Sequence, residues 1–405
     1  MNSAQIQINN KSKIVFLLGC MGVAIYSSNF LNIGNYLPLL IAPVMLFFLI
    51  SKKIEKQFIF IFFSLVAFTI TYSIILIFYG FSSIDAVIGR LLFPPIMFIF
   101  GYYIIVNDKS YKKFTKILFV MIVSLSLFGF LSFLKTIYMY GDFDSYILTN
   151  GRTAINLWGQ NPINATGLNT SLSLGLVLLP LLFLSAKSLK NGNLIKLICL
   201  FCFVITIYTA VQLANRTGLL LVPISFVVLY LAFVKINFRK IITSFIIILV
   251  ILIGYFLYSI NFLNIKIYIQ STLMFQRLNS SDLFDDPRLK AWNDTFFGLF
   301  VNPMGGRKTH LSLNFAHNLW LDIGLDVGVI PLLFLLMFTI FSFLSLRKFM
   351  ELPHPKFLKA LVILLYTAFF VSFMVEPIMQ GWVVYFTLFC FLFGVVQRIN
   401  QEVSN

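Results

Sequence analysis

A few arginines and one histidine, placed at the ends of apolar segments, offer most of the side-chain chemistry in this sequence. Arg216 interrupts the apolar stretch AVQLANRTGLLLVPI, Arg288 stands close to Trp292 in DPRLKAWNDTFF, and His317 lies in NFAHNLWLDIGLDVG. A guanidinium binds phosphate or pyrophosphate through paired hydrogen bonds, and a neutral imidazole accepts a proton near neutral pH. The arginines suit an anionic ligand, and the histidine is a candidate catalyst.

Each of these residues also has a simpler structural explanation, and the sequence alone leaves both open. Arg216 fits a turn whose side chain reaches the lipid headgroups. Arg288 fits a solvated loop charge, and His317 fits a helix cap or a hydrogen-bonding partner. Arg90, in IGRLLFPP, fits an anchor at the membrane interface better than a ligand, and Arg152 lies in an Asn- and Gly-rich loop typical of solvated charges.

The chain that must position these residues is too apolar for a soluble protein. Of its 405 residues, 60% are hydrophobic and only 11% are charged, and the mean hydropathy is +0.94. Soluble domains are about 45–50% apolar and about 25% charged. The apolar runs are continuous rather than alternating, which excludes a β-barrel. We therefore expect an all-α polytopic integral membrane protein, in which residues 1–405 form a single membrane domain.

The number of spans follows from the length of the apolar runs, since a membrane-spanning helix needs about 20 residues. The sequence predicts about twelve transmembrane helices, at 14–30, 36–51, 58–79, 91–106, 114–137, 170–186, 195–213, 217–234, 241–262, 325–346, 359–375 and 382–396.

Charge predicts the orientation of these spans. The formal net charge is +16, and nearly every lysine falls in alternate connections, such as KKIEK at 52–56 and NDKSYKK at 107–113. Cytoplasmic loops of membrane proteins carry such an excess of Lys and Arg. We expect both termini in the cytoplasm and two long periplasmic loops, at 138–169 and 263–324. The positive charge needs no nucleic acid to explain it.

The second long loop is predicted to contain a short amphipathic helix near Arg288–Phe300. Pro287 suits the first turn of a helix, and Leu289, Trp292, Phe296 and Leu299 are spaced to share one face.

Several classes of chemistry lack their motifs in this sequence. It contains no nucleotide-binding, zinc-protease or serine-nucleophile motif, and no run of carboxylates suited to a divalent cation. We expect no metal and no cofactor. The predicted span centres carry almost no charge, which disfavours a proton-coupled transporter. All four cysteines lie in apolar runs and are interpreted as core residues.

Four motifs in order resemble the O-antigen polymerase and O-antigen ligase superfamily of bacterial envelope glycosyltransferases. They are NATGLN entering a span, NRTG opening a span, DPRLKAWNDTFFGLFVNPMGG in the long loop, and AHNLWLDIGLDVGVIPLLF at its end. The motifs cover the chain from Asn164 onward. Gly305-Gly306-Arg307 departs from the glycine pattern of ligases, and the HNLWLD form is more similar to polymerases.

The resemblance implies a metal-independent inverting membrane glycosyltransferase in the bacterial inner membrane, with its active site facing the periplasm. It would transfer a growing glycan from undecaprenyl pyrophosphate to a repeat unit on the same carrier, and a chain-length regulator is a possible partner. It implies catalytic roles for His317, Arg216 and Arg288. The implied substrate-binding residues are Arg216, Arg288, Arg90, Arg152, Asn169, Trp292 and Asn318.

Two other functions remain open from the sequence. An O-antigen ligase would use the same donor and move the glycan to lipid A core. A flippase or exporter of lipid-linked oligosaccharides would need a charged, water-filled cavity between related halves, which the sequence does not clearly show.

Overall fold

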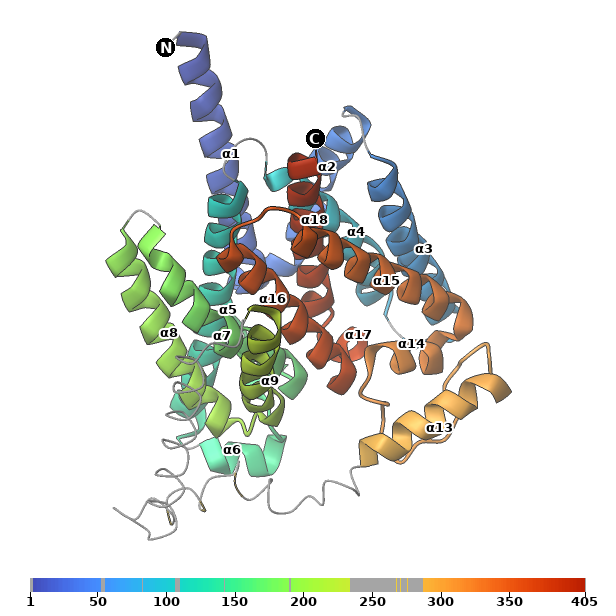
Figure 1. Cartoon of the computed structure of the whole chain (residues 1–405). Coiled ribbons are helices and arrows are strands. Elements are labelled where there is room, and N and C mark those ends of the chain that lie inside the picture. Colours follow the sequence, from blue (N-terminus) through green and yellow to red (C-terminus); the bar gives the residue numbers. More distant parts are fainter. Residues whose placement is uncertain are drawn as a thin grey trace.

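The computed structural model is built almost entirely of helices (Figure 1). It describes residues 3–51, 55–81, 83–105, 110–141, 143–188, 191–233 and 287–404, with three single residues between the last two ranges. The described helices and strands, in chain order, are α1 (Ser3–Ser27), η1 (Phe30–Asn32), η2 (Gly34–Tyr36), α2 (Leu37–Ser51), α3 (Lys56–Phe78), α4 (Ile84–Ile104), α5 (Ser110–Tyr140), α6 (Phe143–Asn150), β1 (Ala154–Ile155), β2 (Pro162–Ile163), α7 (Ala165–Ser185), η3 (Ala186–Ser188), α8 (Gly192–Gln212), α9 (Arg216–Phe233), α13 (Pro287–Val301), α14 (Leu319–Val327), α15 (Val329–Glu351), α16 (Lys356–Val375), α17 (Ile378–Gly381) and α18 (Val383–Ser404).

Eight of the described helices are long and apolar enough to cross a membrane, so the chain has the composition and helix lengths of a polytopic membrane protein. These helices are α3, α4, α5, α7, α8, α15, α16 and α18. Three shorter apolar helices lie at Ile14–Ser27, Gly34–Ile50 and Arg216–Tyr230, where the sequence also predicts spans. The predicted span at 241–262 lies outside the described residues, and the total of twelve stays a prediction.

Two glycines let α4 and α18 pack backbone against backbone in the interior. A Cβ atom at Gly101 would lie 1.8 Å from the carbonyl oxygen of Phe391, and one at Gly394 would lie 2.1 Å from that of Phe98. Membrane helices associate through such close contact, because lipid provides no hydrophobic force between them. Buried aromatic residues of α15, α16 and α18 complete this core. The packing fixes α18, and with it the short α17 that precedes it.

The tenth predicted run, at about 325–346, corresponds to α15, which begins four residues later than predicted because a break at Gly328 separates it from α14. Gly328 separates α14 from α15 with a φ of 85°, a conformation that favours glycine. A Cβ atom there would lie 2.4 Å from the carbonyl oxygen of Pro303, and the Val329 amide donates to the same oxygen at 2.8 Å. The break makes α14 a separate short helix held against the segment that follows α13.

The first long loop is folded rather than irregular. Between α5 and α7 it contains α6 and an antiparallel pair in which Ala154 faces Ile163. The Lys135 ammonium, at the end of α5, donates to the carbonyl oxygens of Asn156, Leu157 and Gly159 at 3.0, 3.2 and 2.6 Å. These bonds fasten the segment to α5 and restrict the position of Arg152, which precedes β1.

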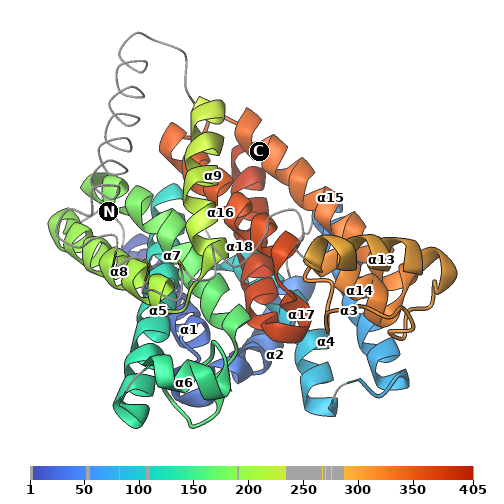
Figure 2. The ribbon, with the colours of Figure 1, turned by 90° about the horizontal axis from the view of Figure 1, so that it is seen from below.

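The two ends of the helical bundle differ in structure. In Figure 1, α1 begins and α18 ends at the upper end, whereas α6 and α13 lie at the lower end. Figure 2, which views the molecule from below, shows α17 between α6 and α13. The segments 141–164 and 287–318, which hold most of the candidate residues, therefore lie at the same end of the molecule.

The orientation predicted from charge is testable by cysteine labelling, because Cys20, Cys199, Cys202 and Cys390 are all buried. A cysteine in place of the exposed Ser312 should react with a membrane-impermeant maleimide in intact spheroplasts. A cysteine in place of the exposed Lys187 should react only after lysis, since this residue follows α7 at the opposite end. The reverse pattern would show that the predicted orientation is wrong.

Candidate functional site

Glu376 is a buried carboxylate at the end of α16, where the bundle meets the folded outer segments. Pro377 follows it and favours an extended backbone at Glu376, so that the helix ends at Val375. Its side chain accepts a hydrogen bond from the Thr166 hydroxyl of α7 and another from the Thr217 hydroxyl of α9, each at 3.2 Å. A buried charge needs such partners, so these contacts tie three helices to one group.

Three predicted arginines, which come from three separate segments, interact electrostatically with Glu376 or with one another. Arg152 precedes β1, Arg216 begins α9, and Arg288 is the second residue of α13. Burial raises the pKa of Glu376, and the positive charges of Arg288 and Arg152 oppose that rise. Burial lowers the pKa of Arg152; Glu376 raises it, while Arg216 and Arg288 lower it further. Arg152 therefore lies within electrostatic reach of Glu376 and of both other arginines.

Local capping explains why Arg216 begins its helix at this place. The preceding Asn215 is buried, and its side-chain oxygen accepts a hydrogen bond from the Gly218 amide at 2.8 Å, as an N-cap residue does. Its side-chain nitrogen donates to the carbonyl oxygen of Asn169 at 3.0 Å. Asn169, for which the resemblance implies substrate binding, is thus buried on α7. Its backbone carbonyl oxygen accepts the bond that positions the turn before Arg216.

Trp292 connects α13 to the segment that carries His317. Its indole N–H donates to the carbonyl oxygen of Ala316 at 2.7 Å. The structure thus has a helix where the sequence predicts one, and part of the predicted apolar face is packed, since Trp292 bonds to Ala316 and Leu299 lies against Gly324 of α14. Ala291 and Thr295 are buried, whereas Leu289 and Phe296 are about half exposed.

His317 lies directly before α14, half-buried, with its backbone in a left-handed conformation at a φ of 56°. A residue other than glycine held in such a conformation costs on the order of 1–3 kcal/mol, which surrounding contacts must offset. The next residue, Asn318, caps α14 through bonds from the Trp320 and Leu321 amides at 3.2 Å. Its side-chain nitrogen lies 3.5 Å from the carbonyl oxygen of Met374, which places His317 near the end of α16 that carries Glu376.

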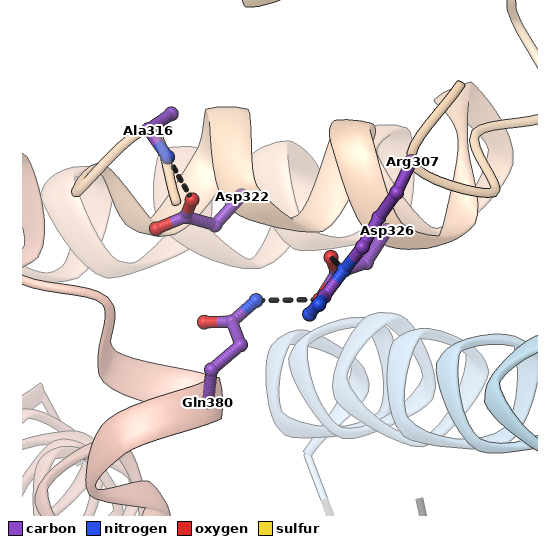
Figure 3. Close-up of polar contacts among 5 residues, drawn as sticks. All are labelled: Arg307, Ala316, Asp322, Asp326 and Gln380. Carbon is purple, nitrogen blue, oxygen red and sulfur yellow. Dashed lines mark hydrogen bonds and ion pairs between the residues drawn. The ribbon is translucent and has the colours of Figure 1, made fainter. Parts of the chain in front are cut away.

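Arg90, on α4, has a structural contact with α17. Its Nε donates to the carbonyl oxygen of Met379 at 3.2 Å, joining α4 to α17. An ion pair that the sequence does not predict supports α17 as well: Asp326 accepts from Arg307 Nε and from Gln380 Nε2, both at 2.7 Å (Figure 3). Arg307 in turn lies over the rings of Phe81 and Phe315.

The predicted site residues therefore divide into two groups. The structure brings Arg152 within electrostatic reach of Arg216 and Arg288, and it joins the segment of His317 to α13 through Trp292 and to α16 through Asn318. Arg90 and Asn169 have contacts that position backbone instead. Glu376 is the residue that sequence reasoning missed. The sequence does distinguish Glu376, because it is an acidic residue at the end of an apolar run. Such residues are few in a chain that has only 14 Asp and Glu in all.

Among the described residues, no group of three or more His, Cys, Asp or Glu side chains could hold a metal ion. The polar groups that do converge are cationic, and they suit an anion with several oxygen acceptors.

Comparison with known proteins found no matching family model and no similar curated protein.

Proposed function

We propose that this protein is a membrane-embedded glycan polymerase that uses a saccharide donor linked to a lipid pyrophosphate. The observation that carries the proposal is that Arg152 lies within electrostatic reach of Arg216, Arg288 and the buried Glu376, at the end of the bundle where α7, α9 and α16 meet. The resemblance to O-antigen polymerases supports the choice of donor, undecaprenyl pyrophosphate, and of acceptor, a repeat unit on the same carrier. The inner membrane and its periplasmic face are the proposed location.

The charge of the cluster supports a pyrophosphate ligand in particular. Three guanidinium groups and one carboxylate leave two net positive charges. A pyrophosphate that joins a lipid to a sugar carries one ionised oxygen on each phosphate, so ligand and site balance. Guanidinium groups also match the geometry of phosphate oxygens through paired hydrogen bonds.

The proposed reaction is an inverting displacement. A hydroxyl of the acceptor sugar attacks the anomeric carbon of the donor, forming the new glycosidic bond as the bond to the pyrophosphate oxygen breaks. The hydroxyl proton passes to the imidazole of His317, and the leaving lipid pyrophosphate keeps the electron pair. The arginines stabilise the negative charge that develops on the leaving group, which is where electrostatic catalysis contributes most.

The deletion of the gene in its source bacterium tests this function against its closest alternative. A polymerase deletion should leave lipid A core that carries a single repeat unit, because ligation still occurs. A ligase deletion would instead leave core without any repeat unit. A normal lipopolysaccharide ladder in the deletion strain would contradict both functions. Turnover by the purified protein distinguishes either enzyme from a flippase, which forms no glycosidic bond.

Complementation of that strain tests Arg216. The Arg216→Ala variant should fail to restore the ladder, and Arg216→Lys should restore it poorly, because a lysine is a point charge and lacks the paired donors of a guanidinium. The control is Arg347→Ala, since Arg347 forms an exposed pair with Glu351 far along α15. A full ladder with Arg216→Ala would reduce Arg216 to an interfacial anchor.

His317 is best tested with asparagine, which tolerates the left-handed backbone that His317 adopts. Loss of a general base should lower turnover per folded molecule by roughly 10²–10⁴-fold, while the affinity for the donor changes little. The exposed His310, seven residues earlier in the same segment, provides the matched variant His310→Asn, for which we expect turnover close to that of the unmodified protein. Near-normal turnover in His317→Asn would exclude the proton-accepting role.

Glu376→Gln tests the charge balance without enzyme activity. The glutamine can keep hydrogen bonds with both threonines but leaves the arginine charges uncompensated, so the melting temperature in detergent should fall. Inorganic pyrophosphate should recover more of this loss in Glu376→Gln than it adds to the unmodified protein. Glu351→Gln, which alters an exposed ion pair, should show neither effect. An unchanged melting temperature in Glu376→Gln would mean that the arginines do not depend on this carboxylate.

A further inference from the structure

Asp322 is a buried carboxylate that the proposed reaction does not use. It lies one turn into α14 and is 1% exposed. Its Oδ1 accepts from the Ala316 amide at 2.7 Å, and its Oδ2 accepts from the Asn318 amide at 3.1 Å. The two oxygens therefore hold the backbone on either side of His317, and Figure 3 shows the bond to Ala316.

The same segment is held from its other side by Trp292. Ala316 donates its amide to Asp322 and accepts the Trp292 indole N–H through its carbonyl oxygen at 2.7 Å. Because Trp292 and Arg288 lie one turn apart on α13, these bonds form a continuous connection from the arginine to the residue before His317.

The hydrogen bonds to Asp322 are not needed to cap α14, and the conformation of His317 points to another role for them. Asn318 already caps α14 with its own side chain. The bond from Asp322 to the Ala316 amide reaches outside the helix, to the residue before the left-handed His317. Strained backbone conformations persist only where surrounding contacts impose them, and they cluster at functional sites.

We propose that Asp322 is a positioning residue that holds His317 in its left-handed conformation and so directs the imidazole toward the reacting sugar hydroxyl. Burial raises the pKa of the Asp322 carboxyl to about 7, whereas the Ala316 and Asn318 amides lower it by binding the charged form. The role of the imidazole in this inference rests on the proposed function. The restraint on the backbone of His317 is independent of that function.

Asp326 provides a matched control for Asp322. It lies four residues later on α14, is equally buried, and also accepts two hydrogen bonds, but these come from the side chains of Arg307 and Gln380 and not from the backbone on either side of His317. Asp322→Asn and Asp326→Asn thus each replace a buried carboxyl group of one helix, and only the first alters the bonds to the Ala316 and Asn318 amides.

The first measurement is turnover and donor affinity of the purified full-length variants with a lipid-pyrophosphate-linked repeat unit. Asp322→Asn should lower turnover per folded molecule by at least about tenfold while the dissociation constant for the donor changes by less than about threefold. Asp326→Asn should lower the melting temperature but leave turnover per folded molecule within about threefold. Equal turnover losses in the two variants, or none in Asp322→Asn, would overturn the positioning role.

The second measurement needs no activity. The chain has three histidines, so carbethoxylation by diethyl pyrocarbonate, read by peptide mass spectrometry, resolves His317 from His310 and His354. The rate at His317 relative to His310 should rise several-fold in Asp322→Asn and stay unchanged in Asp326→Asn. Trp292→Phe removes the hydrogen bond from the indole N–H to the Ala316 carbonyl oxygen, and it should also raise the rate at His317. This variant tests the restraint if Asp322→Asn does not fold.

The two measurements separate the failure of this inference from that of the proposed function. If the unmodified protein forms no glycosidic bond but His317 becomes reactive in Asp322→Asn, the restraint exists and the enzymatic proposal fails. If the protein polymerises and the His317 rate is unchanged in both Asp322→Asn and Trp292→Phe, the restraint is wrong and the enzymatic proposal stands.

Discussion

The buried charge of Glu376 is the constraint around which one end of this protein is arranged. An ionised carboxylate removed from water costs several kcal/mol unless hydrogen bonds and opposite charges compensate it. Glu376 obtains hydroxyl donors from α7 and α9, and positive charge from Arg152 and Arg288. Those partners come from segments that are distant in sequence, so the carboxylate requires α16, α9, the folded segment before β1 and the start of α13 to converge.

This arrangement places like positive charges within electrostatic reach of one another. Arg216 and Arg288 both lower the pKa of Arg152, and the Glu376 carboxylate opposes their effect. Repulsion between like charges in a partly buried site opposes folding, and a site that keeps such strain is suited to an anionic ligand. Pyrophosphate held in this way would be a stabilised leaving group, and the restrained His317 lies on the adjoining segment. Binding of the donor and transfer of the acceptor proton would thus take place at the same end of the bundle.

Most of the helices could be predicted from the sequence, because long apolar runs report membrane spans directly. The helix at Pro287–Val301 could also be predicted, from its proline and the spacing of its apolar residues. The break at Gly328 was not, because the apolar pattern continues across it and only contact with Pro303 shows why a glycine stands there.

The candidate site was predicted only in part. The types of Arg216, Arg288 and His317 suggested their chemistry, and their spacing in the motifs suggested a common site. Arg152 was assigned to a solvated loop, since nothing local shows that Lys135 fastens this loop to α5. Glu376 lies 159 residues from Thr217 and 210 from Thr166, and a contact at such separation has no local pattern. Asp322 was visible as a charge beside a span, but its bonds to the backbone around His317 depend on the folded turn.

The central claim is that the arginine cluster binds a lipid pyrophosphate, and the most direct measurement is equilibrium binding to the purified protein. Undecaprenyl pyrophosphate should bind at least about tenfold more tightly than undecaprenyl phosphate, which carries the same lipid and one phosphate fewer. Replacing Arg152, Arg216 and Arg288 together with glutamine should remove this preference without abolishing the binding of the lipid chain. Equal affinity of the unmodified protein for the two lipids, or a preference that survives the triple substitution, would contradict the account.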